Sequence, residues 1–146
     1  MTLTVKKGNI FDHAGIKMCP VNTKGTMGNG LAYAFKLKYP DVNKAYIEHC
    51  KQGQLTTSNP ILEGNVLLFC TKDDWKNDSK LSYLEDGFKY IAENYVSVGL
   101  KGNIGIPLLG TGKGKLPIEE VTHLMLTLLD NMEIEFTLYL PDNPYI

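Results

Sequence analysis

Hydrophobic and polar residues alternate along the chain in two kinds of segment. Short runs of apolar or β-branched residues predict strands at Thr2–Val5, Ile16–Val21, Asn65–Cys70, Ile104–Leu108 and Ile134–Leu140. Between these runs, apolar residues recur at helical spacing over Leu31–Tyr39, Pro40–Gly53, Ser79–Val98 and Pro117–Asn131. Strands that alternate with helices predict an α/β fold: a three-layer sandwich with a mixed, mostly parallel central sheet.

The 146 residues are expected to form a single domain, because a domain usually holds about 100–200 residues. The run Asn65–Cys70 is apolar throughout, which is typical of a strand that is buried on both faces. Leu37 belongs to the apolar set of its predicted helix, and Ile118 is expected to point inward from its own.

The charged residues narrow the choice of partners. All 15 basic residues are lysines, and 16 acidic residues bring the formal net charge to -1. A near-neutral chain without arginine does not favour tight, sequence-specific binding of DNA. A bound anion would have to be held by backbone N–H groups and lysine ammonium groups, since no guanidinium group is present. The preference for lysine also suggests an AT-rich genome, of bacterial or phage origin.

Cysteine and histidine spacing gives no sign of a metal site or a cofactor. The three cysteines form no C-x-x-C pair and the three histidines are scattered along the chain. An odd number of cysteines fits a reducing compartment. The first residues carry no apolar stretch behind a basic start, and no apolar run approaches the roughly 20 residues of a membrane span. We therefore expect a monomer in the cytoplasm, with no membrane partner.

Two glycine-rich turns each lie between a predicted strand and a predicted helix. They are Thr23–Gly30 (TKGTMGNG) and Leu108–Pro117 (LLGTGKGKLP). In an open α/β sheet such turns lie at the carboxyl ends of the strands, where ligands bind and helix N-termini point. Glycines let backbone N–H groups approach an anion closely, so two such turns indicate a bound diphosphate. Neither turn has the spacing of a P-loop or of a G-x-G-x-x-G fingerprint.

Four segments together resemble the macrodomain family, whose members bind ADP-ribose. Gly8-Asn9-Ile10 is similar to the family's adenine-binding segment. VNTKGTMGNGLAYAFKLKYP and IPLLGTGKGKLP look like its two phosphate loops, and FTLYLP looks like its last strand. The resemblance covers nearly the whole chain. It implies a single macrodomain over residues 1–146 that binds ADP-ribose or an ADP-ribosylated macromolecule.

The resemblance also implies roles for individual residues. Asn9, Ile10 and Tyr139 are expected beside the adenine, and Asn22 beside the hydroxyls of the distal ribose. The residues expected to hold the phosphates and the ribose are Gly25, Thr26, Met27, Gly28, Gly30 and Leu31 in the first loop and Leu109, Gly110, Thr111, Gly112, Lys113 and Gly114 in the second. Asn22 is also expected to take part in the reaction.

Within the family, FCTKDDWKNDSKL resembles a segment of the DNA ADP-ribosyl glycohydrolase antitoxins, the DarG branch, which includes the terminal ADP-ribose glycohydrolase. That branch uses the lysine of its T-K pair in hydrolysis, and the matching residue here is Lys72. Such an amine either attacks the anomeric carbon of an opened ribose or stabilises developing negative charge. The terminal glycohydrolase carries a carboxylate in its second phosphate loop, and this chain has Gly114 at that spacing.

Three functions stay open. Likeness to the DarG branch implies hydrolysis of the link between ADP-ribose and an acceptor, which could be a DNA base. The segment GLAYAFKLKYPDVNKAYIEHC is also similar to fungal ADP-ribose 1″-phosphate phosphatases, which implies phosphate release instead. The third function is that of a reader module that binds ADP-ribose without reaction. Trp75, the single tryptophan, is expected either to pack beside the end of the sheet or to shape the pocket.

Overall fold

The computed structural model describes residues 3–28, 30–110, 114–130 and 132–140. Within these ranges, six strands form one sheet in the order β1-β6-β5-β2-β4-β3. The strands are β1 (Leu3–Lys7), β2 (Lys17–Val21), β3 (Ile61–Glu63), β4 (Val66–Cys70), β5 (Asn103–Pro107) and β6 (Glu135–Leu140). The helices are the 3₁₀ helix η1 (Ile10–Asp12) and the α-helices α1 (Gly30–Lys38), α2 (Pro40–Lys51), α3 (Leu81–Val98) and α4 (Ile118–Leu129).

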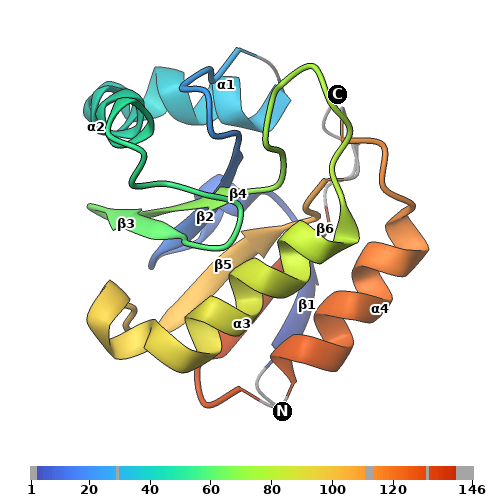
Figure 1. Ribbon diagram of the computed structural model, residues 1–146. Coiled ribbons are helices and arrows are strands. Elements are labelled where there is room, and N and C mark those ends of the chain that lie inside the picture. Colours follow the sequence, from blue (N-terminus) through green and yellow to red (C-terminus); the bar gives the residue numbers. More distant parts are fainter. Residues whose placement is uncertain (1–2, 29, 111–113, 131, 141–146) are drawn as a thin grey trace.

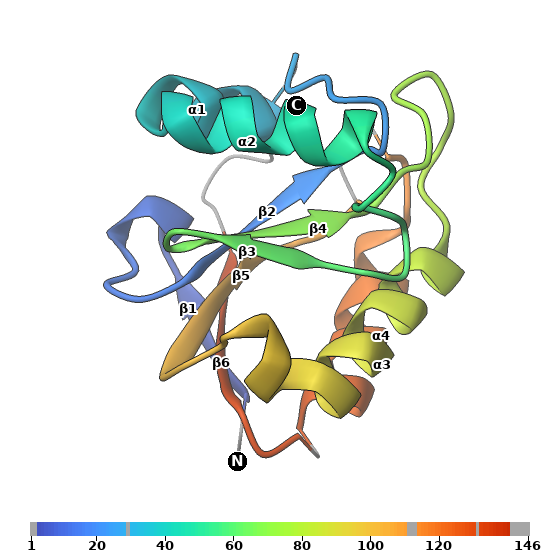
Figure 2. The same cartoon turned by 60° about the vertical axis from the view of Figure 1, so that its left-hand side comes forward.

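The sheet is the middle layer of a three-layer sandwich, as the alternating pattern predicts. Helices α1 and α2 lie on one face of the sheet, and α3 and α4 lie on the other (Figures 1 and 2). Each face has its own hydrophobic core. Phe35 and Tyr46 are fully buried on the side of α1 and α2, and Phe88 and Met125 are fully buried on the side of α3 and α4. No helix within the described ranges has the length and hydropathy that crossing a membrane requires.

The structure confirms the predicted strands and helices to within a few residues and corrects some details. All five residues of β4 are buried, as the apolar run predicts. The inward position predicted for Ile118 is wrong: it is 51% exposed, because it is the first residue of α4, although it shares a helix face with the buried Val121 and Met125. Leu37 is 64% exposed, because it lies on the side of α1 turned away from the buried Leu31 and Phe35. The pattern also misses β3, which pairs antiparallel with β4 at the edge of the sheet. Thr2 and Asn131, at the ends of predicted elements, lie outside the described residues.

The parallel strands gather their carboxyl ends at one edge of the sheet. Val21 and Cys70 are register partners at the ends of β2 and β4. At the other side of the sheet, Pro107 at the end of β5 is paired with Tyr139 of β6. The segments that follow β1, β2, β4 and β5 therefore start from the same edge. This edge is where an open α/β sheet binds ligands.

Gly87 provides a test of the packing between α3 and the sheet. A Cβ atom at this position would lie 2.6 Å from Cε2 and 3.1 Å from Cε1 of the fully buried Phe69 ring. Alanine favours a helix by about 1 kcal/mol over glycine, but overpacking a core costs about 1–3 kcal/mol. We therefore expect Gly87→Ala to lower the free energy of unfolding by about 1–2 kcal/mol in urea denaturation.

The control for this prediction is the double variant Gly87→Ala/Phe69→Leu. Leucine shortens the side chain that the new methyl group meets, so the two substitutions should cost less together than the sum of their separate costs. Strict additivity would show that the Phe69 ring is not the obstacle.

Candidate functional site

The first glycine-rich loop is organised around the side chain of Asn22, which follows β2 and is 6% exposed. Its Nδ2 donates a hydrogen bond to the carbonyl oxygen of Thr26 at 2.9 Å. Its Oδ1 accepts one from the backbone N–H of Lys24, also at 2.9 Å. The amide of Asn22 therefore closes the loop on itself, in addition to any contact it makes with a ligand.

Tyr46 of α2 supports this loop from the core side. Its hydroxyl lies 2.7 Å from the backbone oxygen of Asn22 and 2.9 Å from the Oδ1 of the same residue, and it donates toward both. Burial raises the pKa of Tyr46 well above its usual range, so the hydroxyl keeps its proton. In the sequence, Tyr46 is one apolar position of the helix predicted over Pro40–Gly53, and the helical pattern gives no sign of this contact.

The remaining first-loop residues divide between core and surface. Met27 and Leu31 are buried at 2% and 6% exposure, and they anchor the loop to the core under α1. Gly25 has a φ of 83°, in the left-handed region that favours glycine. Thr26 and Gly28 are exposed. Gly30 is the first residue of α1, so the predicted phosphate loop does lead into a helix N-terminus.

The connection between β4 and α3, residues 71–80, is tied to the first loop. Thr23 donates its backbone N–H to the carbonyl oxygen of Asp73 at 3.1 Å. The Thr23 hydroxyl lies 2.9 Å from Oδ1 of the same aspartate. Figures 1 and 2 both draw this connection beside the segment that follows β2. Lys72 stands one residue before the tie and donates its Nζ to the carbonyl oxygen of Trp75 at 3.4 Å.

The same connection is also tied to the second glycine-rich loop. The backbone N–H of Ser79 donates to the carbonyl oxygen of Gly114 at 3.0 Å. Nearby, Lys115 Nζ lies 3.7 Å from Oδ1 of Asp78, and both side chains are well exposed. Lys72 thus belongs to a segment that is fixed to the first loop at one end and to the second loop at the other.

The second loop is described only in part. Thr111, Gly112 and Lys113, which are predicted phosphate-binding residues, lie outside the described residues. Leu109 is fully buried. Gly110 has a φ of 71° and accepts a hydrogen bond from the backbone N–H of Leu116 at 2.8 Å, which closes the base of the loop.

Gly114 has no room for a side chain. A Cβ atom there would lie 2.5 Å from the backbone oxygen of Gly110 and would overlap the hydroxyl of Ser79. That hydroxyl is buried and has no hydrogen-bond partner among the described residues. The carboxylate that the terminal glycohydrolase carries at this spacing therefore cannot be accommodated here, and Ser79 occupies the space instead.

The residues predicted to contact adenine lie together at the end of β1 and β6. The backbone N–H of Gly8 donates to the oxygen of Leu140, so the segment that follows β1 runs beside the end of β6. Tyr139 is 6% exposed, and its ring lies 3.7 Å from where a Cβ atom at Gly8 would be. Ile10 is fully buried. Asn9 is exposed, and its Oδ1 caps η1 by accepting from the backbone N–H of Phe11 at 2.9 Å.

His13 contributes to this end of the site, although the scattered spacing of the histidines gives no sign of it. Its Nδ1 lies 2.9 Å from the hydroxyl of Tyr139, and its Nε2 lies 2.7 Å from the backbone oxygen of Asn103. Its ring packs where a side chain at Gly105 would stand. His13 therefore fixes the direction of the Tyr139 side chain. The small residue Gly105 is the only sequence signal of this contact, and it is a weak one.

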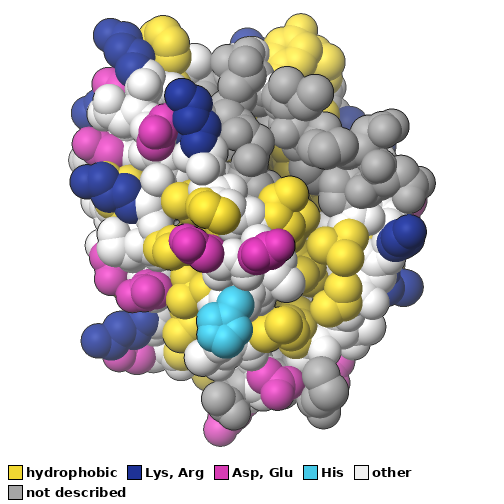
Figure 3. Space-filling model, turned by 90° about the vertical axis from the view of Figure 1, so that its right-hand side faces the viewer, with side chains coloured by type: hydrophobic (Ala, Val, Ile, Leu, Met, Phe, Trp, Pro, Cys, Tyr) yellow, Lys and Arg dark blue, Asp and Glu magenta, His cyan; other side chains and the backbone are white. Residues whose placement is uncertain are grey.

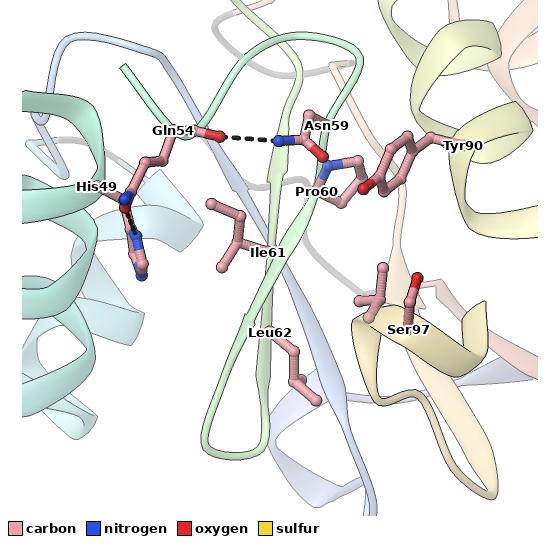
Figure 4. A pocket seen from close by; sticks show the side chains of 9 residues that line it. His49, Gln54, Asn59, Pro60, Ile61, Leu62, Tyr90 and Ser97 are labelled. Atoms are coloured by element: carbon pink, nitrogen blue, oxygen red, sulfur yellow. Dashed lines mark hydrogen bonds between the residues drawn. The ribbon is translucent and has the colours of Figure 1, made fainter. Parts of the chain in front are cut away.

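A shallow hollow of about 300 Å³ lies away from the loops, beside the edge strand β3 (Figure 4). His49 Nε2 lies 2.7 Å from Glu63 Oε1, and His49 Nδ1 lies 2.7 Å from Gln54 Oε1. Burial alone lowers the pKa of His49, but the hydrogen bonds with Glu63 and Gln54 and the charge of Glu63 outweigh it and raise that pKa. Because these polar groups already bond one another, the hollow offers no converging set of groups to a ligand.

The other reactive side chains do not form a second centre. The described residues contain no group of three or more His, Cys, Asp and Glu that could hold a metal ion. Burial raises the pKa of Cys19, Cys50 and Cys70, so these thiols are poor nucleophiles at neutral pH. The groups at the carboxyl edge of the sheet are therefore the candidate site.

The sequence pattern of the macro domain matches residues 19–125, which include the first loop, the β4–α3 connection and the second loop. The chain belongs to the macro domain family. A DNA ADP-ribosyl transferase-DNA ADP-ribosyl glycohydrolase fusion protein of Thermosipho africanus is 35% identical over 144 residues, which cover 83% of this chain and 37% of that protein. The solved structure of Thermosipho africanus DarTG in complex with ADP-ribose matches this macrodomain with a TM-score of 0.88.

That DarTG structure is 33% identical and covers 99% of this macrodomain and 43% of the other chain. An ADP-ribose 1″-phosphate phosphatase of Lodderomyces elongisporus is 24% identical over 163 residues, which cover 97% of this chain and 100% of that protein. The macrodomain spans 37% of the length of the DNA ADP-ribosyl glycohydrolases that it matches. The relatives thus include two classes of ADP-ribose hydrolase, as the sequence resemblance predicts.

The support that Tyr46 gives to the first loop can be tested by Tyr46→Phe. Phenylalanine keeps the ring but removes the buried donor to Asn22, and an unsatisfied buried polar group costs about 1–3 kcal/mol. We expect the free energy of unfolding of this macrodomain to fall by that amount in urea denaturation. Tyr33→Phe is the matched control, because Tyr33 is 45% exposed. Equal effects of the two substitutions would contradict the assigned role of Tyr46.

Proposed function

We propose that this macrodomain binds ADP-ribose and hydrolyses its link to an acceptor. The observation that carries the proposal is the position of Lys72, in a segment that is tied to both phosphate loops through Thr23–Asp73 and Ser79–Gly114. A lysine held between two loops that bind a diphosphate lies within reach of the distal ribose. Likeness to named DNA ADP-ribosyl glycohydrolases supports this function.

The ligand would lie along the carboxyl edge of the sheet. Its adenine would sit at the Asn9 and Tyr139 end, and its diphosphate between the two loops, held by backbone N–H groups. The N-terminus of α1 would add a favourable dipole. The distal ribose would reach the first loop near Asn22. This arrangement of the ligand needs no arginine side chain, and the basic residues of this chain are all lysines.

Lys72 would act on the anomeric carbon of the distal ribose in one of two ways. As a nucleophile, its neutral amine would displace the acceptor from the opened ribose, and water would then hydrolyse the resulting Schiff base to release ADP-ribose and restore the amine. As an ammonium group, it would stabilise negative charge on the leaving acceptor. Gly114 cannot supply a carboxylate for either route, so proton transfer would depend on other groups or on water.

Two other functions compete with this one. The likeness to an ADP-ribose 1″-phosphate phosphatase over 97% of the chain supports removal of a phosphate from the same ribose carbon. A reader module that binds without turnover would need the loops but not Lys72. The glycohydrolase function is favoured because the identity to those relatives is higher, at 35% against 24%.

We also propose a cellular location, an origin and an oligomeric state for the protein. Three free cysteines fit the cytoplasm, where thiols stay reduced. An arginine-free, lysine-rich composition and the bacterial sources of the most similar relatives support a bacterial or phage origin. The protein would act as a monomer, without tight binding of a specific DNA sequence.

Gly28→Val tests the first loop. Among the described residues, a Cβ atom at Gly28 comes within 4 Å of Thr26 Cγ2 alone, at 3.4 Å, so the substitution should leave the fold intact. The added side chain would block close approach of the backbone to a phosphate, and the affinity for ADP-ribose in calorimetry should fall by about tenfold or more. The melting temperature is the control for folding. Unchanged affinity would remove Gly28 from the phosphate site.

Lys72→Ala tests the reaction. We expect turnover to fall on the order of 10²-fold or more, while the affinity for ADP-ribose changes far less. The measurement is release of ADP-ribose from a single-stranded oligonucleotide that carries one ADP-ribosylated base. Lys101→Ala is the matched control, since Lys101 is exposed just before β5, at the opposite edge of the sheet.

The substrates distinguish the three functions. Release of phosphate from ADP-ribose 1″-phosphate, with no release from the oligonucleotide, would favour the phosphatase. Binding without turnover of either substrate would favour the reader module. Full activity of Lys72→Ala would exclude Lys72 from the mechanism.

A further inference from the structure

The hydroxyl of Ser79 is a buried polar group that lacks a hydrogen-bond partner. Ser79 directly precedes Lys80, the N-cap residue of α3, and is 5% exposed. Its backbone N–H donates to the carbonyl oxygen of Gly114 at 3.0 Å, but its Oγ has no partner among the described residues. Buried hydroxyl groups without a partner are unfavourable and rare in folded proteins. Ser79 is therefore a candidate for a hydrogen bond to a ligand.

The same hydroxyl is directed toward the base of the second glycine-rich loop. A Cβ atom at Gly114 would overlap Oγ of Ser79, and a Cβ atom at Gly110 would lie 3.3 Å from it. Ser79 thus lies between the two glycines that begin and end the G-T-G-K-G sequence of this loop. Because both positions are glycines, neither places a side chain between the hydroxyl and a phosphate that is bound by the loop.

The N-terminus of α3 lies next to this hydroxyl and is not compensated by the chain. The helix is 18 residues long, no side chain among the described residues caps it, and its first turn holds no acidic residue. The N–H groups of Leu81 and Ser82 have no acceptor inside the helix, because the first helical bonds form only after four residues. Aligned peptide dipoles give this terminus a partial positive charge, which favours an anion.

Helix α4, which follows the second loop in the chain, is less suited to an anion. Its first turn holds Glu119 and Glu120, which are both exposed. Their carboxylates already compensate the dipole of α4, and they repel a phosphate. The side of the molecule that carries α4 faces the viewer in Figure 3, and acidic side chains lie in the middle of it. An anion at the second loop therefore gains more from α3, which the Ser79–Gly114 hydrogen bond ties to this loop.

The other polar and aromatic side chains around Ser79 are exposed. Trp75 is 51% exposed, so it does not pack beside the end of the sheet, which was one of its two expected roles. Asp78 and Lys115 are both well exposed and lie 3.7 Å apart, and Lys80 is exposed as well. Salt screens exposed charges. The donors with fixed positions are therefore the buried hydroxyl of Ser79 and the first N–H groups of α3.

We propose that the Ser79 hydroxyl and the N-terminus of α3 bind the phosphate that is joined to the distal ribose of ADP-ribose. An oxygen of this phosphate accepts a hydrogen bond from Ser79 Oγ, and the phosphate faces the N–H groups of Leu81 and Ser82. We call these three donors the Ser79 site. The proposal rests on the proposed function, in which the diphosphate lies between the two loops and Lys72, in the same connection as Ser79, acts on the distal ribose.

Removal of the hydroxyl tests the site with ligands of different length. AMP has only the phosphate next to adenosine, whereas ADP also has the second one. In calorimetry, Ser79→Ala should weaken binding of ADP and ADP-ribose about tenfold and binding of AMP by less than about twofold. The melting temperature of the ligand-free protein should stay the same or rise, because the lost group has no partner there.

Ser97→Ala is the matched control, because Ser97 is exposed at the far end of α3. It should leave the affinities for all three ligands unchanged. Equal losses of AMP and ADP affinity in Ser79→Ala would overturn the proposal. A lower melting temperature with unchanged affinities would also overturn it, since the hydroxyl would then be bonded in the free protein.

A charge in the first turn of α3 tests the helix without a change at Ser79. Ser82→Glu favours the free helix but repels a phosphate at its N-terminus, so the affinity for ADP-ribose should fall about threefold to fivefold. Ser82→Gln adds similar bulk without the charge and should have a smaller effect. Ser97→Glu makes the same charge change at the far end of the helix. Equal losses for Ser82→Glu and Ser97→Glu would overturn the site, because net charge alone would explain them.

These measurements distinguish failure of the Ser79 site from failure of the proposed function, because ADP and AMP bind without any reaction. If Ser79→Ala binds ADP-ribose as tightly as the wild type, the Ser79 site is wrong and the proposed function stands. If Ser79→Ala weakens binding of ADP but the wild type hydrolyses no modified acceptor, the Ser79 site stands and the hydrolase fails. If the wild type binds neither ADP nor ADP-ribose, both are wrong.

Discussion

The candidate site depends on the connection between β4 and α3 being held at both ends. Thr23 fixes it to the first loop and Gly114 fixes it to the second, and both ties use backbone N–H and carbonyl groups. Because backbone groups carry these ties, they hold the connection in place without using the side chain of Lys72, which donates to the carbonyl oxygen of Trp75. Without the ties, the two glycine-rich loops and Lys72 would be three separate features of the sheet edge.

The hydrogen bonds of the Asn22 side chain, which shape the first loop, are a second constraint on the site. The Asn22 side chain already bonds Thr26, Lys24 and Tyr46. An amide with this many internal partners has little remaining capacity for the hydroxyls of a ribose. Its main contribution is to the shape of the loop, so the ligand would be met mostly by backbone groups whose positions Asn22 determines.

The sequence predicts the architecture well because periodicity reports burial, and its misses have physical causes. The apolar run Asn65–Cys70 leaves little choice but a central strand. The edge strand Ile61–Glu63 is missed because three half-buried residues show no periodicity. Ile118 is misplaced because the hydrophobic pattern does not show that it is the first residue of its helix, where the apolar face is exposed. Tyr46 is hidden because its hydroxyl partner lies far away in the chain, which no local pattern can reveal.

The ties that shape the site join parts of the chain that are synthesised at different times. Thr23 and Asp73 are separated by 50 residues, and the Ser79–Gly114 tie joins the middle of the chain to the segment before α4. Closing long loops is slow, since chain entropy opposes it until the contacts at both ends can form. As the chain leaves the ribosome, β2 and β4 can pair before the second loop exists. The sheet itself is completed later still, because β6 (Glu135–Leu140), which lies between β1 and β5, follows the second loop in the chain. The central sheet and the edge that carries both glycine-rich loops are therefore completed together, only once Leu140 has been synthesised.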